Sequence, residues 1–243
     1  MPAHLGVIAA VRDRLRTLAD PAAAAPMRRY MKSELPFHGV RADTRRRAFR
    51  EIFAAFPMDD PITWEDTVRT MWRVATHREE RYAAVDLTGH PLYRKFQTPP
   101  VTALYEDLIV AGGWWDYVDE LAIRRVGPLL RSHPGRVRPI VISWALTGDV
   151  WLRRSAIICQ VGAKGETDPG LLFASIEPNL SHKGYFIRKA IGWSLREYAK
   201  TDPDAVRTFV TKHSEVLSAL SRREALRHLE RYEDPLSGEE SIS

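Results

Sequence analysis

Acidic and basic side chains stand beside tryptophans at helical spacing in this 243-residue chain. Trp115 and Asp119 are four residues apart, and Trp193 and Arg196 are three apart, so each pair shares one face of a predicted helix. An indole plane beside a carboxylate can stabilise positive charge, and an arginine can bind phosphate. Taken singly, each tryptophan is more often a core residue, and Asp119 could form an ordinary surface ion pair.

Other common chemistries lack their residue patterns. The chain has no phosphate-binding glycine loop, no dinucleotide-binding glycine motif, no nucleophile elbow and no zinc-protease helix motif. No two of its eight histidines stand four residues apart on a helix, so we expect no metal and no other cofactor. Its one cysteine, Cys159, lies in an apolar run and is predicted to be a buried core thiol. A single cysteine also excludes an intramolecular disulfide framework and favours a reducing, cytoplasmic compartment.

The net charge of +5 conceals two strongly basic blocks. Residues 1–50 have a net charge of +7 and residues 121–200 one of +8, whereas residues 51–120 and 201–243 have −7 and −3. Clustered Lys and Arg are typical of proteins that bind a polyanion such as DNA or RNA, with pronounced salt dependence. Ordinary solvated helix faces would explain the same counts equally well.

Helical periodicity recurs along the whole chain, and strand signals are nearly absent. Thr44 is predicted to cap a helix over 45–56. Leu5, Ile8, Val11, Leu15 and Leu18 predict a first helix that stops at Asp20-Pro21. Further helices are expected at 62–75, 78–89, 100–111, 115–132, 136–146, 150–162, 169–178, 185–200, 203–212 and 221–232. No apolar stretch is long enough to predict a membrane span.

Two of these helices begin with similar residues. Trp151-Leu-Arg-Arg-Ser-Ala-Ile and Phe186-Ile-Arg-Lys-Ala-Ile-Gly match at an offset of 35 residues, which suggests a degenerate HEAT-like period in the high thirties. The predicted fold class is therefore all-α, a HEAT-like helical-repeat solenoid with a concave basic groove. It is expected to form one domain over 1–234, followed by a flexible tail at 235–243. An irregular helical bundle is the alternative.

At these residues the chain resembles bacterial HEAT-repeat DNA alkylation repair proteins, the AlkD-type alkylpurine DNA glycosylases. The likeness spans most of the chain and is most specific in the run from Phe186 to Lys200. Its other segments are Pro26-Met-Arg-Arg-Tyr-Met-Lys32, Glu106-Asp-Leu-Ile, Trp114-Trp-Asp-Tyr-Val-Asp119, Trp151-Leu-Arg-Arg154 and Leu220-Ser-Arg-Arg-Glu-Ala225.

The resemblance implies a role for each matching position. The second acid of the Trp-Trp-Asp-x-Val-Asp stretch, Asp119, would be the catalytic carboxylate, with the aromatic planes of Trp115 and Trp193 beside it. Arg154 and Arg196 would support it and clamp phosphates, and Tyr30 would face the DNA. The full set of expected DNA-binding residues is Arg154, Arg196, Tyr30, Lys32, Arg153, Lys183, Arg188 and Lys189.

The implied activity is hydrolysis of the N-glycosidic bond of positively charged alkylated purines, N3-alkyladenine and N7-alkylguanine, in base excision repair. The implied partner is double-stranded DNA, bound through backbone and sugar contacts by a monomer without a cofactor, in the cytoplasm and at the nucleoid. The alternative is a non-catalytic HEAT-repeat scaffold that binds DNA or protein. Retention of both acids of the Trp-Trp-Asp-x-Val-Asp stretch favours the enzyme.

Overall fold

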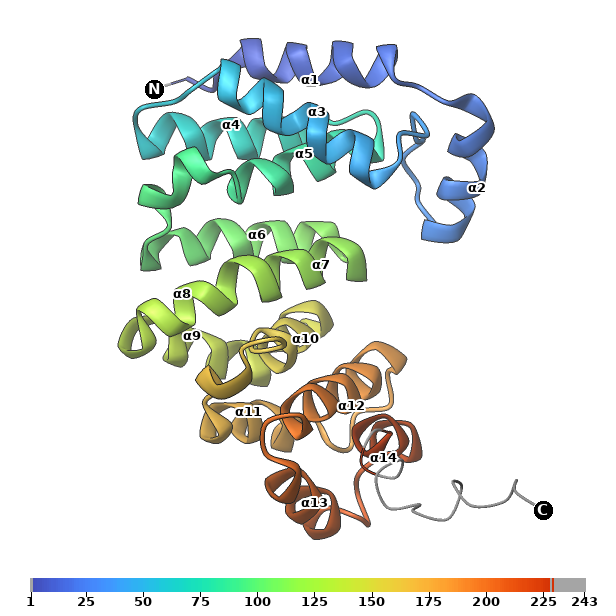
Figure 1. The fold of residues 1–243 in the computed structure, drawn as a ribbon, viewed down its shortest axis with the longest axis vertical. Helices are drawn as coiled ribbons and strands as arrows, with labels where there is room; N and C mark the ends of the chain where they lie inside the picture. The colour runs from blue at the N-terminus through green and yellow to red at the C-terminus, as the bar shows by residue number, and fades with distance from the viewer. Residues whose placement is uncertain (1, 228, 230–243) are drawn as a thin grey trace, which may run out of the picture. The chain divides into compact units, whose positions relative to one another are not determined.

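A computed structural model describes residues 2–227 and 229 of the chain, and every regular element in this part is helical (Figure 1). The predicted all-α class is confirmed. Contacts between residues divide the chain into two compact units, residues 1–104 and the part that begins at Tyr105. The expectation of one solenoid domain over 1–234 stays a prediction, and the tail at 235–243 lies outside the described residues.

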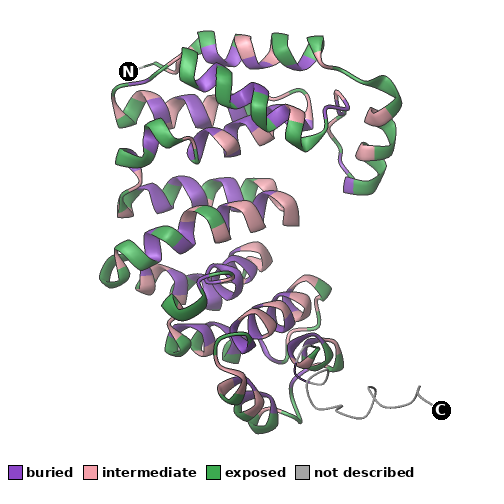
Figure 2. Ribbon diagram, viewed as in Figure 1, coloured by how far each residue is buried: buried purple, intermediate pink, exposed green. Residues whose placement is uncertain are grey.

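The first unit contains five α-helices and two short 3₁₀ turns. These are α1 (Leu5–Thr17), α2 (Pro21–Met31), α3 (Ala42–Ala55), α4 (Pro61–Arg73), α5 (Arg78–Thr88), η1 (Pro91–Phe96) and η2 (Pro99–Val101). Helices α1, α3, α4 and α5 pack on one another through the buried side chains of Leu15, Phe49, Phe53, Trp64 and Met71. In Figure 2 the buried residues lie on the helix faces that meet neighbouring helices.

In this unit one expectation was wrong and one helix was missed. Helix α3 begins at Ala42 with Arg41 as its N-cap, so Thr44 lies inside the helix and does not cap it. Helix α2 was not predicted, because only Met31 in it is buried and no apolar periodicity marks it. Its start is nevertheless encoded locally: the Asp20 carboxylate accepts hydrogen bonds from Ala22 N and Ala23 N, and Pro21 occupies the first helical position.

The second unit holds the remaining helices. They are α6 (Thr102–Gly112), whose first turn lies at the boundary, α7 (Trp115–Leu121), η3 (Ala122–Val126), α8 (Gly127–Ser132), α9 (Pro134–Leu146), α10 (Val150–Ile158), η4 (Lys164–Glu166), α11 (Pro169–Ile176), η5 (Glu177–Asn179), α12 (Tyr185–Ala199), α13 (Pro203–Lys212) and α14 (Ala219–Leu226). The segment η3 is a π-helical turn that joins α7 to α8. The helix expected at 150–162 ends earlier, at Ile158.

The core of the second unit is apolar and includes the lone cysteine. Ile157, Ile158, Ile187, Ile191 and Leu195 are part of one buried cluster. Helix α10 packs against α7, α9 and α12, and α12 packs against α13 and α14. Thus the two matching segments at 151 and 186 begin helices that are neighbours in space. Cys159 is buried as expected, and burial raises the pKa of its thiol to about 12.

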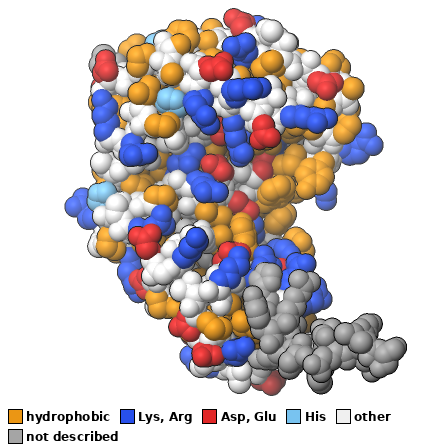
Figure 3. Space-filling model, in the orientation of Figure 1, with side chains coloured by type: hydrophobic (Ala, Val, Ile, Leu, Met, Phe, Trp, Pro, Cys, Tyr) orange, Lys and Arg blue, Asp and Glu red, His pale blue; other side chains and the backbone are white. Residues whose placement is uncertain are grey.

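Charged side chains of both signs cover the face of the molecule drawn in Figure 3. Over the helices of the first unit, Lys and Arg side chains lie among Asp and Glu side chains on this face. Among the described residues, no helix combines the length and apolar character that a bilayer crossing requires.

Helices α12 and α14 approach closely at Gly192. A Cβ atom built there would lie 2.5 Å from Glu224 Cβ and 2.9 Å from the Ser221 carbonyl oxygen. Ser221 Oγ also donates a hydrogen bond to the Arg188 carbonyl oxygen, at 2.8 Å, across the same interface. The absence of a side chain at position 192 therefore sets how closely α14 can pack.

Gly192→Ala should lower the free energy of unfolding by about 1–3 kcal/mol, because overpacking forces the two helices apart. Gly135→Ala in α9 is the matched control, since a Cβ there meets nothing within 4 Å. The control should be neutral or stabilising by up to about 1 kcal/mol. Urea unfolding measures the stability of each variant. If Gly192→Ala and Gly135→Ala were equally stable, the close contact at Gly192 would not limit the size of the side chain there.

Candidate functional site

Asp119 and Arg154 form a two-pronged ion pair between α7 and α10. The Arg154 Nε donates to Asp119 Oδ1 and the Arg154 Nη2 to Asp119 Oδ2, both at 2.7 Å. The planar guanidinium fork matches the two oxygens of a carboxylate, so this contact fixes the orientation of both groups. The two residues singled out in the sequence as acid and supporting arginine are thus in direct contact.

The Arg154 side chain is enclosed by the second unit, with 5% of its surface exposed. Its third nitrogen, Nη1, donates to the Phe186 carbonyl oxygen at 2.8 Å, at the start of α12. All three guanidinium nitrogens are therefore used inside the unit. Sequence reasoning expected this arginine to bind phosphate, whereas here its hydrogen bonds hold Asp119 and α12.

Burial is the main influence on the Asp119 carboxyl group. It raises the pKa of Asp119 above the usual 3.8, while the hydrogen bonds and positive charge of Arg154 act in the opposite direction. Nearby Asp116 adds a smaller upward contribution. The Asp119 side chain is still 18% exposed, so it is not sealed inside the unit. The site therefore presents a fixed, partly desolvated acid at the surface of the unit.

Three aromatic rings pack on one another, and one of them, Phe186, lies near this ion pair. The Trp151 and Phe186 ring centroids are 4.8 Å apart, and Trp114 lies 6.2 Å from Trp151 and 5.5 Å from Phe186. The Arg154 Cζ lies 5.9 Å from the Phe186 ring, and the exposed Tyr185 packs its ring edge-on against Phe186. Of these rings, Phe186 is the one that lies over the guanidinium, and it connects Arg154 to the aromatic cluster.

Sequence reasoning did not identify this aromatic cluster. A signal for it was present: Trp151 and Phe186 occupy equivalent positions of the two segments that match at an offset of 35. Equivalent positions of neighbouring helices in a repeat array lie side by side, so their side chains can meet. Trp114 was noted only as a neighbour of Trp115.

Trp115 and Trp193, the two predicted aromatic planes, are both half-buried. Trp115 lies one helical turn before Asp119 in α7, as its spacing predicted. Trp193 packs partly against the apolar core of the second unit. It is seven residues after Phe186 in α12, which places it on the same side of that helix, about 10 Å further along the axis.

A second charge cluster joins α12 to α14. Glu224 accepts a hydrogen bond from Lys189 Nζ at 2.8 Å and also binds Arg196 Nη1. The hydrogen bond and charge of Lys189, together with those of Arg196, lower the pKa of Glu224 against a smaller upward effect of burial. Two cations predicted to bind DNA are thus paired with an acid that sequence reasoning did not single out.

The remaining predicted DNA-binding residues differ in their surroundings. Arg153 bonds to Asn179 Oδ1 at 2.9 Å and to the Leu146 and Thr147 carbonyl oxygens. Arg188 has a buried Nε that makes no hydrogen bond, and Lys183 is exposed. In the first unit Tyr30 is 75% exposed, and Lys32 caps α2 with a left-handed backbone at φ 49°. The second unit therefore uses most of its predicted cations in internal contacts.

Comparison with known proteins identifies the family. The family model described as DNA alkylation repair enzyme matches residues 11–229. This chain belongs to the DNA alkylation repair enzyme family. Among solved structures it is similar to one titled "Predicted DNA alkylation repair enzyme from Enterococcus faecalis", with a TM-score of 0.72 and 27% identity over 87% of this chain and 96% of that one. A search of curated proteins found no match.

Family membership supports an enzyme that acts in the repair of alkylated DNA. The described residues around Asp119 provide no group of metal ligands. The one such group found in the described part of the chain consists of His38, His77 and Glu80, in the first unit.

The Glu224 cluster gives this DNA repair protein a pH-dependent contribution to stability. A carboxyl group whose pKa is lowered on folding stabilises the fold above its unfolded pKa, here about 4.5, and loses that effect as pH falls through the folded value. The stability difference between wild type and Glu224→Gln should therefore be constant from neutral pH to about pH 5 and shrink at lower pH. Urea unfolding over this range measures it, and a difference independent of pH would refute the electrostatic origin.

Proposed function

We propose that this protein is a DNA glycosylase that excises positively charged alkylated purines from duplex DNA. The substrates are N3-alkyladenine and N7-alkylguanine, and the reaction is hydrolysis of the N-glycosidic bond. The observation that supports this most directly is the Asp119 carboxylate, held in two-pronged contact by Arg154 on a side chain that is still 18% exposed. Family membership supplies the independent link to alkylated DNA.

Excision of a cationic base requires an anion near the sugar and does not require a strong acid to protonate the leaving base. Alkylation at N3 of adenine or N7 of guanine makes the base cationic, so it leaves with the bond electrons as a neutral molecule. Positive charge then develops on the deoxyribose, and water adds to C1′ and loses a proton. Asp119 would stabilise the oxocarbenium-like charge and position that water.

Aromatic planes suit the same substrate. An indole face attracts a cation by about 0.5–2 kcal/mol and also packs against a sugar. Trp115 lies one helical turn before Asp119 in α7. Trp193 lies on α12, and the Phe186 carbonyl of that helix accepts a hydrogen bond from Arg154. Both are half-buried and so have surface available for a ligand. Together they would favour a charged lesion over a normal base.

Asp119→Asn keeps the shape of the side chain and removes its charge. Excision of N7-methylguanine should fall by about 100-fold or more, because an electrostatic group of the transition state is lost. Affinity for DNA should stay equal or rise slightly, since the carboxylate repels phosphates in the ground state. Release of the free base from methylated duplex DNA and a binding titration measure the two effects.

Two comparisons make this test decisive. Uracil, a neutral lesion, should not be released by the wild type, because the site offers no acid for a neutral leaving group. Excision by Asp119→Asn at the wild-type rate would refute the role of Asp119. Failure of the wild type to release any alkylated purine would favour the non-catalytic DNA-binding scaffold.

We propose that Arg154 positions Asp119. A pH profile of the excision rate can distinguish this positioning role from a role of Arg154 in phosphate binding. Arg154→Gln removes both a positive charge and hydrogen bonds that lower the pKa of Asp119, so that pKa should rise. The acid limb of the excision rate should then move to higher pH. Arg154→Lys keeps the charge and should shift it less.

Arg153→Gln is the matched control, since Arg153 bonds to Asn179 and to backbone carbonyls and not to Asp119. It should leave the acid limb in place. If Arg154 instead holds phosphate, as the sequence suggested, Arg154→Gln would weaken DNA affinity and excision together without moving the acid limb. Because a buried partner is removed, unfolding should also become easier by about 3–5 kcal/mol, and the assays belong well below the melting temperature.

A further inference from the structure

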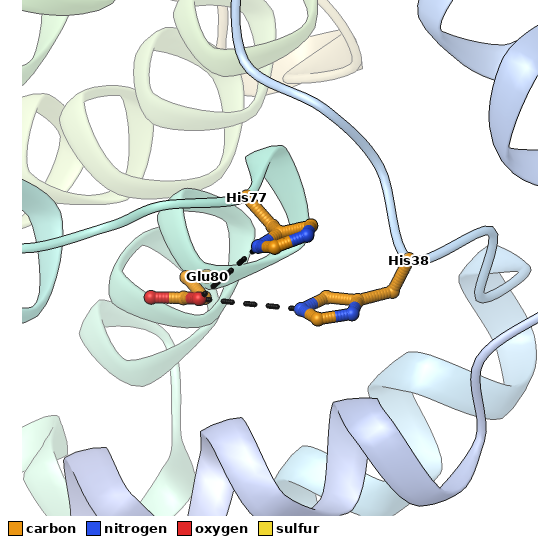
Figure 4. A group of neighbouring side chains, drawn as sticks. All are labelled: His38, His77 and Glu80. Carbon is orange, nitrogen blue, oxygen red and sulfur yellow. Dashed lines mark ion pairs between the residues drawn. The ribbon is translucent and has the colours of Figure 1, made fainter.

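Two histidines and a glutamate meet in the first unit at the start of α5. His77 is the residue that precedes α5, Glu80 lies in its first turn, and His38 comes from the loop between α2 and α3 (Figure 4). Glu80 Oε1 is 3.7 Å from His77 Nδ1 and 4.0 Å from His38 Nε2. One ligand atom from each of the three residues lies within 4.8 Å of the other two.

The backbone holds His38 in this position. The buried Glu79 carboxylate accepts hydrogen bonds from the backbone N–H groups of His38, Gly39 and Val40 at 3.0, 2.9 and 3.2 Å. Gly39 has φ +88°, and a Cβ there would lie 2.0 Å from the Asp20 carbonyl oxygen, so only glycine fits. The loop is therefore fixed to α5, and His38 is kept beside His77 and Glu80.

The His38 side chain is 9% exposed, and its Nε2, which points toward Glu80, makes no hydrogen bond. A buried ring nitrogen without a partner costs free energy, so such atoms call for a ligand. Burial, followed by the neighbouring His77, lowers the pKa of His38 and favours the neutral ring. A neutral imidazole offers a lone pair to a metal ion.

We propose that His38, His77 and Glu80 form a binding site for a divalent transition-metal ion, with Zn²⁺ as the best match. Two imidazole nitrogens and one carboxylate oxygen are a donor set that zinc accepts, with water as a fourth ligand. His77, with 31% of its side chain exposed, provides the access route. The sequence indicated no metal because no two histidines stand four residues apart on one helix, and here a loop supplies the second histidine.

Binding requires one local movement. The two imidazoles are stacked, with centroids 3.7 Å apart and planes 16° apart, whereas a metal ion lies near the plane of each ring that binds it. The more exposed ring of His77 would turn about its Cβ–Cγ bond. Glu80 Oε1, which now accepts from Thr76 Oγ1 at 2.9 Å, would be the ligand, and Oε2 would keep its 2.9 Å hydrogen bond from Arg12 Nε.

Charged groups of both signs surround the cluster. Glu79 and Glu80 favour a cation, whereas Arg12, paired with Glu80, and Arg16, whose charge acts on His38, oppose one. Because the site joins the 38–40 loop to α5, the bound ion should stabilise the first unit.

The test uses the full chain freed of metal by a chelator. Zn²⁺ titrated against a chromophoric zinc indicator at about pH 7.5 should give one tightly bound ion per chain, and thermal melts should show a higher Tm with Zn²⁺. His77→Ala should weaken binding by about 100-fold or more, since even changes outside the first ligand shell cost about 10- to 100-fold. It should keep the metal-free Tm but lose the zinc-induced shift.

His133→Ala is the matched control, because His133 lies in the second unit at the start of α9 and is not part of the group. It should bind zinc as the wild type does. Co²⁺ should give the intense visible absorption of a four-coordinate site in the wild type and not in His77→Ala. The absence of stoichiometric binding by the wild type, or equal binding by His77→Ala, would overturn the proposal.

Discussion

The second unit depends on the burial of one guanidinium group. Arg154 is almost fully enclosed, and a buried charge without a partner costs several kcal/mol. It is compensated by both oxygens of Asp119 on α7 and by the Phe186 carbonyl at the start of α12. Three helices must therefore keep their relative positions for the charge to be satisfied, and the same contacts fix the carboxylate.

Four charged residues of the second unit recur at one fixed interval. Asp119, Arg154, Lys189 and Glu224 follow one another at intervals of 35 residues. The first two form one ion pair and the last two form another. Helix α10 packs against α7, and α12 packs against α14, so a charge on one helix is balanced by the opposite charge on its neighbour.

This pairing limits what the basic residues can offer to DNA. Lys189 and Arg196 share Glu224, and Arg153 is bonded to Asn179 and to carbonyl groups, so a phosphate would have to compete with these partners. Lys183 and, in the first unit, Lys32 are exposed and need no such exchange. A positive count of Lys and Arg in a segment is therefore not the same as a positive surface.

By itself the sequence determined most of the helices and the family likeness, and it singled out Asp119 and Arg154. Local capping and apolar periodicity are short-range properties, so most helix positions were predicted from neighbouring residues alone. Helix α2, which buries only Met31, was missed because it lacks that periodicity. Only the tertiary structure decided that Arg154 faces Asp119, that Glu224 takes up two cations, and that His38 meets His77. These contacts join residues at least 28 positions apart, and their formation depends on how the helices pack.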